Sequence, residues 1–362
     1  MFFLEILILY KLSYFEILSI NNCLNIDIRI SFSLIGGRKI MFDMDIGIDL
    51  GTANVLVYVK GKGIVINQPS VVAFEKKSKR LIAIGNKAKQ MMGKEPDYIE
   101  VIRPLRQGVI SDYTVTERML KTFIETAMQK KKMLSRPRIC VCVPSGVTEL
   151  ERRGVEDALY HSGAKHVDIM EEPIAAAIGA GIDIALPRGN MIVDIGGGTT
   201  DVAVISLGGI VESNSLKIAG DDYNEAIIKY IRRTYNLLIG EPTAEKIKMT
   251  IGTVYPREEP VTMEVKGRDL VTGFPARILV SSEETIEAFA EVTAQILDTI
   301  HNVLEISPPE LIADIAESGI LLSGGGSLIY GMDRLVSDST GIRAMVSPNA
   351  LEAVVVGAGK SS

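Results

Sequence analysis

The sequence has no tryptophan and only three cysteines and three histidines among its 362 residues. Cys23, Cys140 and Cys142 are too few and too irregularly spaced for a disulfide framework, so we expect a reducing, cytoplasmic setting. The histidines lack the spacing of metal ligands, which argues against a histidine metal site. Positive charge is not in excess, because the net charge is -6. This charge argues against nucleic acid as the main partner.

The first forty residues also lack a long uninterrupted apolar run. Charged residues break every apolar stretch before it reaches membrane-spanning length, namely Glu5, Lys11, Glu16, Asp27 and Arg29. A signal peptide is disfavoured, because Lys11 lies inside the apolar run and no small-residue cleavage site follows. We interpret residues 1–40 as an extension outside the fold, with Met41 as the physiological start. A peripheral membrane anchor is the alternative.

Beyond Met41, short apolar runs that end at glycines alternate with helical patterns, which predicts an α/β architecture. Residues 116–132 predict a helix, because their apolar side chains recur at helical spacing: Met119, Leu120, Phe123, Ile124 and Ala127. Ser281 and Glu284 form the pattern of a capping box, which predicts a helix from there to Leu304. Pro308 and Pro309 are expected to end it.

Two short apolar segments, residues 139–143 and 320–323, are predicted to be buried strands. Cys140 and Cys142 would then share one face of the first strand. We interpret them as core residues and not as a redox pair, because neighbours two apart on a strand seldom have disulfide geometry.

The chain contains an internal repeat. Residues 46–59 read IGIDLGTANVLVYV and residues 192–205 read IVDIGGGTTDVAVI, so each has a strand that ends in aspartate, a glycine and threonine turn, and a second strand. Asp49 and Asp194 are 145 positions apart (194 minus 49), which is enough for one domain per copy. Two related halves facing one another would form a cleft with one acidic turn on each wall.

These turns have the composition of phosphate-binding loops. Glycines let backbone N–H groups converge on an anion, and Thr52, Thr199 and Thr200 add hydroxyl groups. Because Asp49 and Asp194 would repel phosphate, the pattern predicts a hard cation between them, most simply Mg²⁺ with its water shell. A nucleoside triphosphate with its metal fits this arrangement. For one copy alone, a plain β-hairpin with a glycine turn is the competing interpretation.

A third glycine cluster, residues 324–326 followed by Ser327, lies between a predicted strand and a predicted helix. It suits close approach to a nucleotide, although such turns are common. The chain has neither a Walker motif nor a G-x-G-x-x-G sequence after a strand, which excludes P-loop and dinucleotide-binding readings.

Five motifs in order resemble the actin, Hsp70 and sugar-kinase superfamily, and within it the MreB family of bacterial actin homologues with its paralogues Mbl and MreBH. They are DLGTAN (49–54), EEPIAAAIGAG (171–181), DIGGGTTD (194–201), AGDDYNEAI (219–227) and SGGGSLIYGM (323–332). The similarity extends from about Met41 to Gly359, and the phrases NQPSVVAF, IRPLRQGVISDY and GRDLVTGFP also match.

The resemblance implies an actin-like ATPase fold, with two related α/β domains around a nucleotide cleft. Domain I would comprise residues 41–187 with a smaller subdomain at about 73–107. Domain II would comprise residues 188–362 with a smaller subdomain at about 222–283.

The resemblance also implies a role for each motif. Asp49 and Asp194 would hold Mg²⁺ through water, and Glu172 would position the attacking water with Asp194 as a second catalytic residue. A solvated pair, Glu171 and Glu172, at a helix start is the alternative. The implied nucleotide-binding residues are Gly51, Thr52, Ala53, Asn54, Gly196, Gly197, Gly198, Thr199, Gly220, Asp221, Glu245, Lys248, Gly324, Gly325, Gly326 and Ser327. Glu245 and Lys248 would also suit a plain surface helix. Pro242, where relatives usually carry arginine, adds to that doubt.

The function implied by the resemblance is that of a slow ATPase that forms homopolymeric filaments at the inner face of the cell membrane. These filaments would direct cell-wall synthesis and rod shape together with the wall-elongation machinery. Met133 and Leu134, ringed by basic residues, are expected to enter the membrane surface. Their packing back on the core is the alternative. A chaperone-type ATPase and a small-molecule kinase of the same fold are the competing functions, and GTP is the alternative nucleotide.

Overall fold

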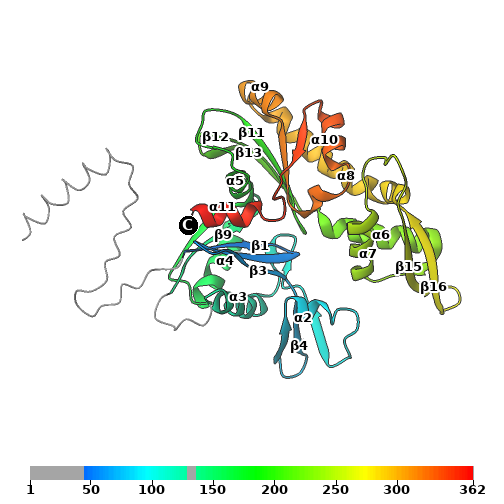
Figure 1. Cartoon of the computed structure of the whole chain (residues 1–362). Coiled ribbons are helices and arrows are strands. Elements are labelled where there is room, and N and C mark those ends of the chain that lie inside the picture. Colours follow the sequence, from blue (N-terminus) through cyan, green and yellow to red (C-terminus); the bar gives the residue numbers. More distant parts are fainter. Residues whose placement is uncertain (1–44, 129–135, 362) are drawn as a thin grey trace, which may run out of the picture. The chain divides into compact units, whose positions relative to one another are not determined.

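The structure is a computed structural model of the whole chain, and it describes residues 45–128 and 136–361 (Figure 1). The described residues from Asp45 onward belong to one compact unit. The predicted boundary between residues 187 and 188 therefore stays a prediction. The interpretation of residues 1–40 and the predicted membrane residues, Met133 and Leu134, lie outside the described residues.

Two five-stranded sheets have the same strand order and the same strand directions. The first has the order β3-β2-β1-β9-β10 and the second β13-β12-β11-β17-β18. In each, the first three strands are antiparallel and the last two run parallel to the third. The strands of the first sheet are Gly63–Pro69, Asn54–Val59, Asp45–Leu50, Arg138–Val143 and His166–Glu171. Those of the second are Gly209–Leu216, Thr200–Ser206, Asn190–Ile195, Ile320–Ser323 and Ala344–Val346.

This matching order confirms the α/β class and the internal repeat. The predicted hairpins are β1 with β2 and β11 with β12, and in the second hairpin Asp194 lies opposite Asp201. β11 and β12 are buried on both faces, which fits the nearly continuous apolar runs that these strands show in the sequence. The predicted strands at 139–143 and 320–323 are β9 and β17.

The predicted helices form with small shifts in their bounds. α3 (Tyr113–Ala127) begins at the N-cap Asp112 and buries all five of the apolar residues predicted for it. Residues 129–132 of that prediction lie outside the described residues. α8 (Ser282–Ile306) is capped by Glu284, which accepts a hydrogen bond of 2.7 Å from the Ser281 N–H. Pro309 follows its end and also opens α9 (Pro309–Ser318), where a missing N–H is harmless.

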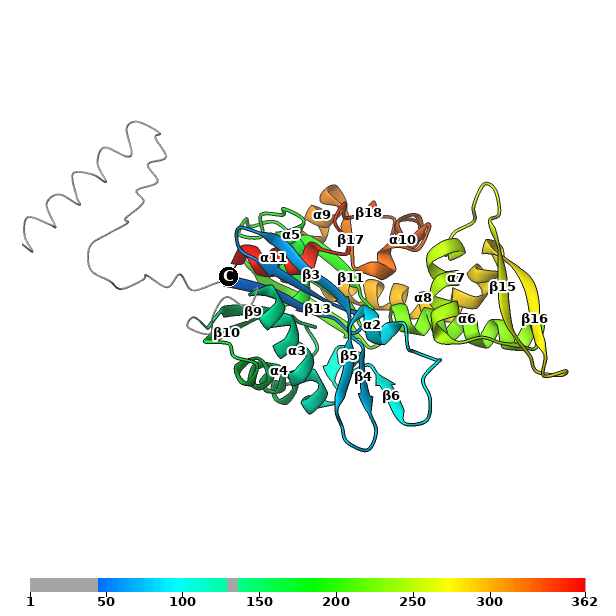
Figure 2. The same ribbon diagram turned by 60° about the horizontal axis from the view of Figure 1, so that its bottom comes forward.

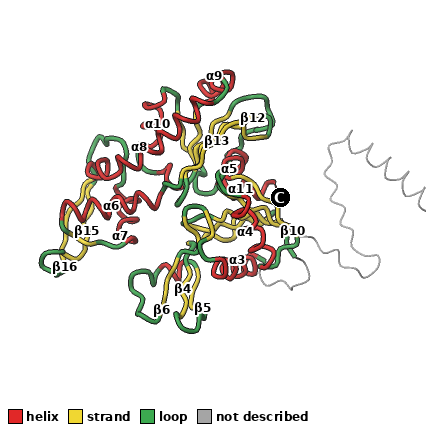
Figure 3. The backbone as a smooth tube through the Cα atoms, turned by 180° about the vertical axis from the view of Figure 1, so that it is seen from behind, coloured by secondary structure: helices red, strands yellow, loops and turns green. Residues whose placement is uncertain are grey.

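Two further helices, α4 (Glu149–His161) and α10 (Met332–Thr340), precede the last strand of each sheet. α5 (Glu172–Gly179) follows the last strand of the first sheet and α11 (Ala353–Ser361) follows that of the second. α5 and α11 lie side by side in Figures 1 and 3 and pack closely on each other. Their contact is made of alanines and glycines, so the two backbones approach closely.

Cys140 and Cys142 face the small-residue layer that α5 and α11 form, and both are buried free thiols. Burial raises the pKa of Cys140 to about 11 and that of Cys142 well above its usual value. Both thiols therefore stay protonated at neutral pH and are poor nucleophiles. The prediction that they belong to the core is confirmed.

Each half also carries a smaller sheet, and Figure 2 shows the two smaller sheets separately. In the first half, β5-β4-β6 forms a three-stranded sheet beside the short helix α2, and β7 and β8 follow as a two-stranded ribbon. Their bounds are Leu81–Ile84, Val72–Glu75, Ile99–Ile102, Asn86–Lys89, Leu105–Arg106 and Val109–Ile110.

In the second half, β14-β15-β16 forms the smaller sheet beside α6 and α7. Their bounds are Leu237–Leu238, Thr262–Asp269, Pro275–Ser281, Gly220–Tyr235 and Glu241–Ile251. The predicted ranges of the smaller subdomains stay predictions.

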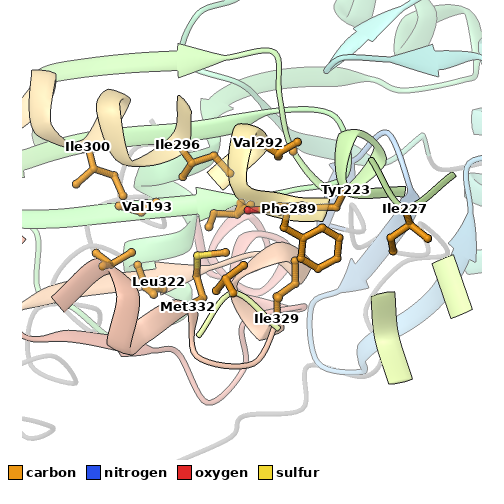
Figure 4. Packing of buried hydrophobic residues seen from close by; sticks show 14 of the residues in the cluster. Val193, Tyr223, Ile227, Phe289, Val292, Ile296, Ile300, Leu322, Ile329 and Met332 are labelled. Atoms are coloured by element: carbon orange, nitrogen blue, oxygen red, sulfur yellow. The ribbon is translucent and has the colours of Figure 1, made fainter. Parts of the chain in front are cut away.

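The core of the second half lies between its sheet and α8. Figure 4 shows Phe289 against Tyr223, with ring centroids 4.7 Å apart and ring planes at 76°, an edge-to-face pair. Val193 and Leu322 supply the sheet side of this core. Burying each such side chain contributes about 1.5–3 kcal/mol to stability. Among the described residues, no helix combines the length and the apolar character needed to cross a membrane.

Candidate functional site

The two repeated turns touch where the halves meet. Gly51, Thr52 and Ala53 form the turn between β1 and β2, Asn54 begins β2, and residues 196–199 form the turn between β11 and β12. A Cβ placed on Gly197 would lie 2.7 Å from the Cβ of Ala53, so only glycine allows this approach. Thr52 is buried, and its hydroxyl accepts a hydrogen bond of 3.0 Å from the Gly108 N–H.

The second turn is tied to the start of α6. The Gly220 and Asp221 N–H groups donate to the carbonyl oxygens of Gly196 (3.1 Å) and Gly197 (2.8 Å). Lys248 on α7 donates to the Gly220 carbonyl oxygen at 2.6 Å. Burial lowers the pKa of this lysine. The structure thus brings the predicted phosphate and ribose residues, and Lys248, together.

The third glycine cluster lies against Asp194. Gly324 has a φ of 78°, and a Cβ there would lie 2.9 Å from an Asp194 carboxylate oxygen. A short 3-10 helix, η1 (Gly325–Leu328), follows, and the Ser327 hydroxyl donates to the Gly324 carbonyl oxygen at 2.7 Å. The third glycine cluster, more than a hundred positions away in the sequence, therefore lies beside the acidic side chain of the second hairpin.

Four buried carboxyl groups lie close enough here for their charges to interact: Asp49, Glu172, Asp194 and Asp201. Burial raises the pKa of Asp49 to about 7. Burial and the charges of Asp201 and Asp49 raise the pKa of Asp194 to about 7, while Ser323 opposes the shift. Burial, followed by the charges of Asp201, Asp49 and Asp194, raises the pKa of Glu172 well above its usual value. Such a cluster favours a bound cation.

Glu172 lies at the first position of α5, where Pro173 fits because the first turn needs no backbone N–H. Its side chain is buried, with 8% of the residue exposed. Glu171, which caps the helix, is half-exposed and lies 3.7 Å from Arg152. The alternative of a solvated pair is therefore wrong for Glu172, which faces the other three carboxylates.

A magnesium ion held through water fits these residues. The Asp194 Oδ1 atom is buried and has no hydrogen-bond partner in the part of the chain that the structure describes. Within those same residues, no group of three or more histidine, cysteine, aspartate or glutamate side chains is arranged to hold a metal ion directly. The site thus offers acceptor atoms but no complete protein cage, as expected for Mg²⁺, which keeps several waters and uses substrate phosphates as ligands.

Glu245, one of the predicted nucleotide-flanking residues, is paired with the opposite half. It lies 2.7 Å from the Lys89 ammonium nitrogen, on α2. Pro242 stands where relatives usually carry arginine. It lies in the first turn of α7, where proline is tolerated, so the helix forms. Asp221 likewise pairs with Arg103 of the first half, at 2.9 Å.

Asp201, Ser145 and Arg103 are functional candidates that the sequence did not single out. Asp201 is fully buried, and one of its oxygens accepts 2.8 Å hydrogen bonds from both the N–H and the hydroxyl of Ser145. A signal was available, because an aspartate within a strand that is otherwise buried on both faces requires a partner. Arg103 lies inside the phrase IRPLRQGVISDY, but its partners are more than a hundred positions away.

Comparison with known sequences gives consistent results. The family model described as MreB/Mbl protein matches residues 43–362. The cell shape-determining protein Mbl of Bacillus subtilis (strain 168) is 50% identical over 319 residues, which is 88% of this chain and 96% of that protein. The cell shape-determining protein MreB of Escherichia coli (strain K12) is 49% identical over 325 residues, covering 89% of this chain and 94% of that protein.

Solved structures agree with the sequence comparison. MreB5 of Spiroplasma citri, in crystals with ADP, has a TM-score of 0.84 and 41% identity over 87% of this chain and 95% of its own. MamK in a double helical filament has a TM-score of 0.76 at 22% identity, covering 88% of this chain and 98% of its own, which shows the fold alone. The motifs, the paired sheets and these relatives lead to one assignment: the chain belongs to the MreB/Mbl family of actin-like proteins.

Proposed function

We propose that this protein is an ATP-binding and ATP-hydrolysing cytoskeletal protein that forms filaments and determines cell shape. One observation carries the proposal. Two glycine turns from related halves touch, and four carboxylates whose charges interact lie buried beside them. The names of the relatives, cell shape-determining proteins Mbl and MreB, support the biological role. The structures of MreB5 with ADP and with AMPPNP support a nucleotide as the ligand.

In the proposed site, the turns at 51–54 and 196–199 bind the β- and γ-phosphates through backbone N–H groups. Gly220, Asp221, Glu245 and Lys248 flank the ribose and adenine, and residues 324–327 approach the adenosine from the other side. Asp49 and Asp194 would hold Mg²⁺ through water, and the ion would supply positive charge that neutralises the phosphates and lowers the pKa of the carboxylates.

Glu172 is the proposed catalytic residue. Once ionised, it accepts a hydrogen bond from a water molecule and aligns that water with the γ-phosphorus. Asp201 is fully buried and accepts two hydrogen bonds from Ser145, so we assign it a contact between the halves and no role at the water. Since the protein aligns water and forms no covalent intermediate, we expect slow hydrolysis. We infer that the nucleotide acts mainly by changing the angle between the two halves.

Filament formation follows from repeated head-to-tail contacts that do not close into a ring. MamK, which shares this fold, forms a double helical filament, and this supports the proposal. We propose that the filaments lie on the inner face of the cell membrane and accompany the wall-elongation machinery. The Mbl and MreB relatives support this role over a chaperone-type ATPase or a small-molecule kinase.

The experiment that tests the function is sedimentation of the purified protein on lipid vesicles with Mg²⁺ and ATP, beside a phosphotransfer assay with sugars. We expect nucleotide-dependent pelleting, phosphate release and no sugar phosphorylation. Phosphotransfer without assembly would contradict the proposal and favour the kinase.

Membrane attachment has its own test. Arg136 and Arg138, which follow the predicted membrane residues, are exposed, and each basic residue near anionic lipid adds about 1 kcal/mol of attraction. Replacing Met133 and Leu134 by serine should abolish the part of the pelleting that depends on vesicles, while ATP binding persists. Unchanged pelleting would contradict the membrane proposal alone.

A further inference from the structure

One ion pair and one three-residue cluster of ion pairs join the smaller parts of the two halves. Lys89, at the end of α2, lies 2.7 Å from a carboxylate oxygen of Glu245 on α7. Arg103, between β6 and β7, contacts two acidic residues with its two terminal nitrogens: Glu241 at 2.6 Å and Asp221 at 2.9 Å. Figure 2 shows α2 next to the green segment that carries α6 and α7.

The geometry at Arg103 is that of a strong ionic contact. A guanidinium group is planar and holds several donors in fixed directions, so one arginine can bind two carboxylates at once. Its side chain is 12% exposed and those of Asp221 and Glu241 are 35% and 41% exposed, whereas Arg233 and Glu287 are 69% and 66% exposed. Water and salt therefore screen the Arg103 contacts less than an ordinary surface pair.

The acidic partners belong to the elements that flank the proposed nucleotide. Asp221 is the second residue of α6, and its N–H donates to Gly197 in the second phosphate turn. Glu241 begins α7, which also carries Lys248, the residue that contacts Gly220. Arg103 and Lys89 come from the first half, so both contacts must break before these elements can separate from it.

We propose that the Lys89–Glu245 and Arg103–Asp221–Glu241 contacts form a latch that sets the rate at which nucleotide leaves the site. The inference rests on the proposed function, since it assumes that nucleotide binds between the halves. The latch opposes separation of the halves, and nucleotide departs when both sets of contacts open together. No chemical step of hydrolysis is assigned to Lys89, Arg103 or Glu241.

The first test measures release of a fluorescent ATP analogue from the full chain after mixing with excess unlabelled ATP. Arg103→Gln should raise the dissociation rate constant about tenfold or more, which corresponds to about 1.4 kcal/mol. Lys89→Gln should raise it by a smaller factor, because its ion pair is single and more exposed. The matched control is Arg233→Gln, which removes an arginine–glutamate contact of 2.8 Å within one half and should leave the rate unchanged.

A double-mutant cycle separates the ion pair from other effects of the substitutions. Arg103→Gln and Glu241→Gln should each raise the dissociation rate constant. The fold-increase in the double variant should be smaller than the product of the two single fold-increases. Rising salt should accelerate release from the unmodified protein more than from Arg103→Gln. Independent, multiplicative effects would overturn the latch. So would dissociation from Arg103→Gln at the unmodified rate.

A second measurement does not require nucleotide. Fluorescent labels at Ser78→Cys and Thr272→Cys, both exposed and in opposite smaller parts, report their separation. Cys23 is replaced by serine in this background, and Cys140 and Cys142 are buried. Arg103→Gln should lengthen or broaden the distance distribution, and an unchanged distribution would overturn the latch.

If the unmodified chain binds no ATP, the proposed function fails and the latch fails with it. Binding with unchanged release rates removes the latch alone.

Discussion

The two halves of the molecule share one topology but differ at the start of the helix that follows the last strand of each sheet. In the first half this helix is α5, and its first residue, Glu172, is buried among other carboxylates. In the second half it is α11, and the glutamate just before it, Glu352, is exposed. The repeated fold therefore supplies two equivalent places, and only the one that faces the carboxylate cluster has the environment for chemistry.

A second difference lies beyond the central parallel strand. β9 is followed by Pro144 and Ser145, and Ser145 donates to Asp201 in the other half. β17 is followed by three glycines, which allow the chain to approach Asp194. The same point in the topology thus carries a hydrogen bond between the halves in one copy and a close backbone packing against Ile195 and Asp194 in the other.

The largest expected effect tests the two glutamates against each other. Glu172→Gln should reduce ATP hydrolysis about 10²-fold or more, because the amide no longer accepts the proton or aligns the water as a carboxylate does. Nucleotide should still bind. Glu352→Gln should hydrolyse ATP at the unmodified rate. Phosphate release measured at saturating ATP decides the outcome, and near-normal release by Glu172→Gln would mean that the catalytic residue was misidentified.

The two aspartates are expected to be equivalent. Asp194→Asn should weaken magnesium-dependent ATP binding about 10- to 100-fold, the range for groups that act on a metal through its bound ligands. Asp49→Asn should weaken it similarly. Titration calorimetry with ATP, with and without Mg²⁺, measures both. A change confined to one aspartate would show that the halves contribute unequally to the metal.

The helix pair between the halves allows a symmetrical stability test. A Cβ on Gly179 of α5 would overlap the carbonyl oxygen of Ala353, and one on Gly357 of α11 would overlap that of Ala175. Each Gly→Ala substitution should lower the free energy of unfolding by about 3 kcal/mol, since overpacking outweighs the gain in helix propensity of about 1 kcal/mol. Urea unfolding measures the change. An unchanged midpoint for either variant would show that the helices can move apart freely.

The smallest expected effect has the opposite sign. Gly154 lies within α4, and a Cβ there would meet no atom within 4 Å. Gly154→Ala should therefore raise the free energy of unfolding by about 0.5–1 kcal/mol through reduced backbone entropy of the unfolded chain. The same urea series serves as the control for the two crowded glycines. A lower free energy of unfolding would mean that the added methyl group meets a steric contact at this position.

Much of the fold could be predicted because its signals are local. The glycine turns, the apolar strands and the helical spacing of Met119, Leu120 and Phe123 each span fewer than twenty positions, and the structure has them where they were expected. The capping residue Glu284 is likewise three positions from Ser281. Such patterns determine local conformation because the interacting atoms are near one another in the chain.

Parts of the site could not be predicted because their partners are distant in sequence. Glu245 was predicted to flank the nucleotide, with a plain surface charge as the alternative, and neither interpretation included its ion pair with Lys89, 156 positions away. Arg103 lies in a phrase that matches the family, but the sequence carries no sign of its partner, because Asp221 is 118 positions away. No periodicity records such pairs, since charged residues on helix surfaces are common whether or not they have a partner.

The sequence by itself determined that this protein has two related halves with an acidic glycine turn in each, because strand and turn formation depend on neighbouring residues. Only the tertiary structure decided which acidic groups are buried together and which are held by cations of the other half. The physical reason is that burial and charge pairing depend on distances in space between segments that share no local pattern.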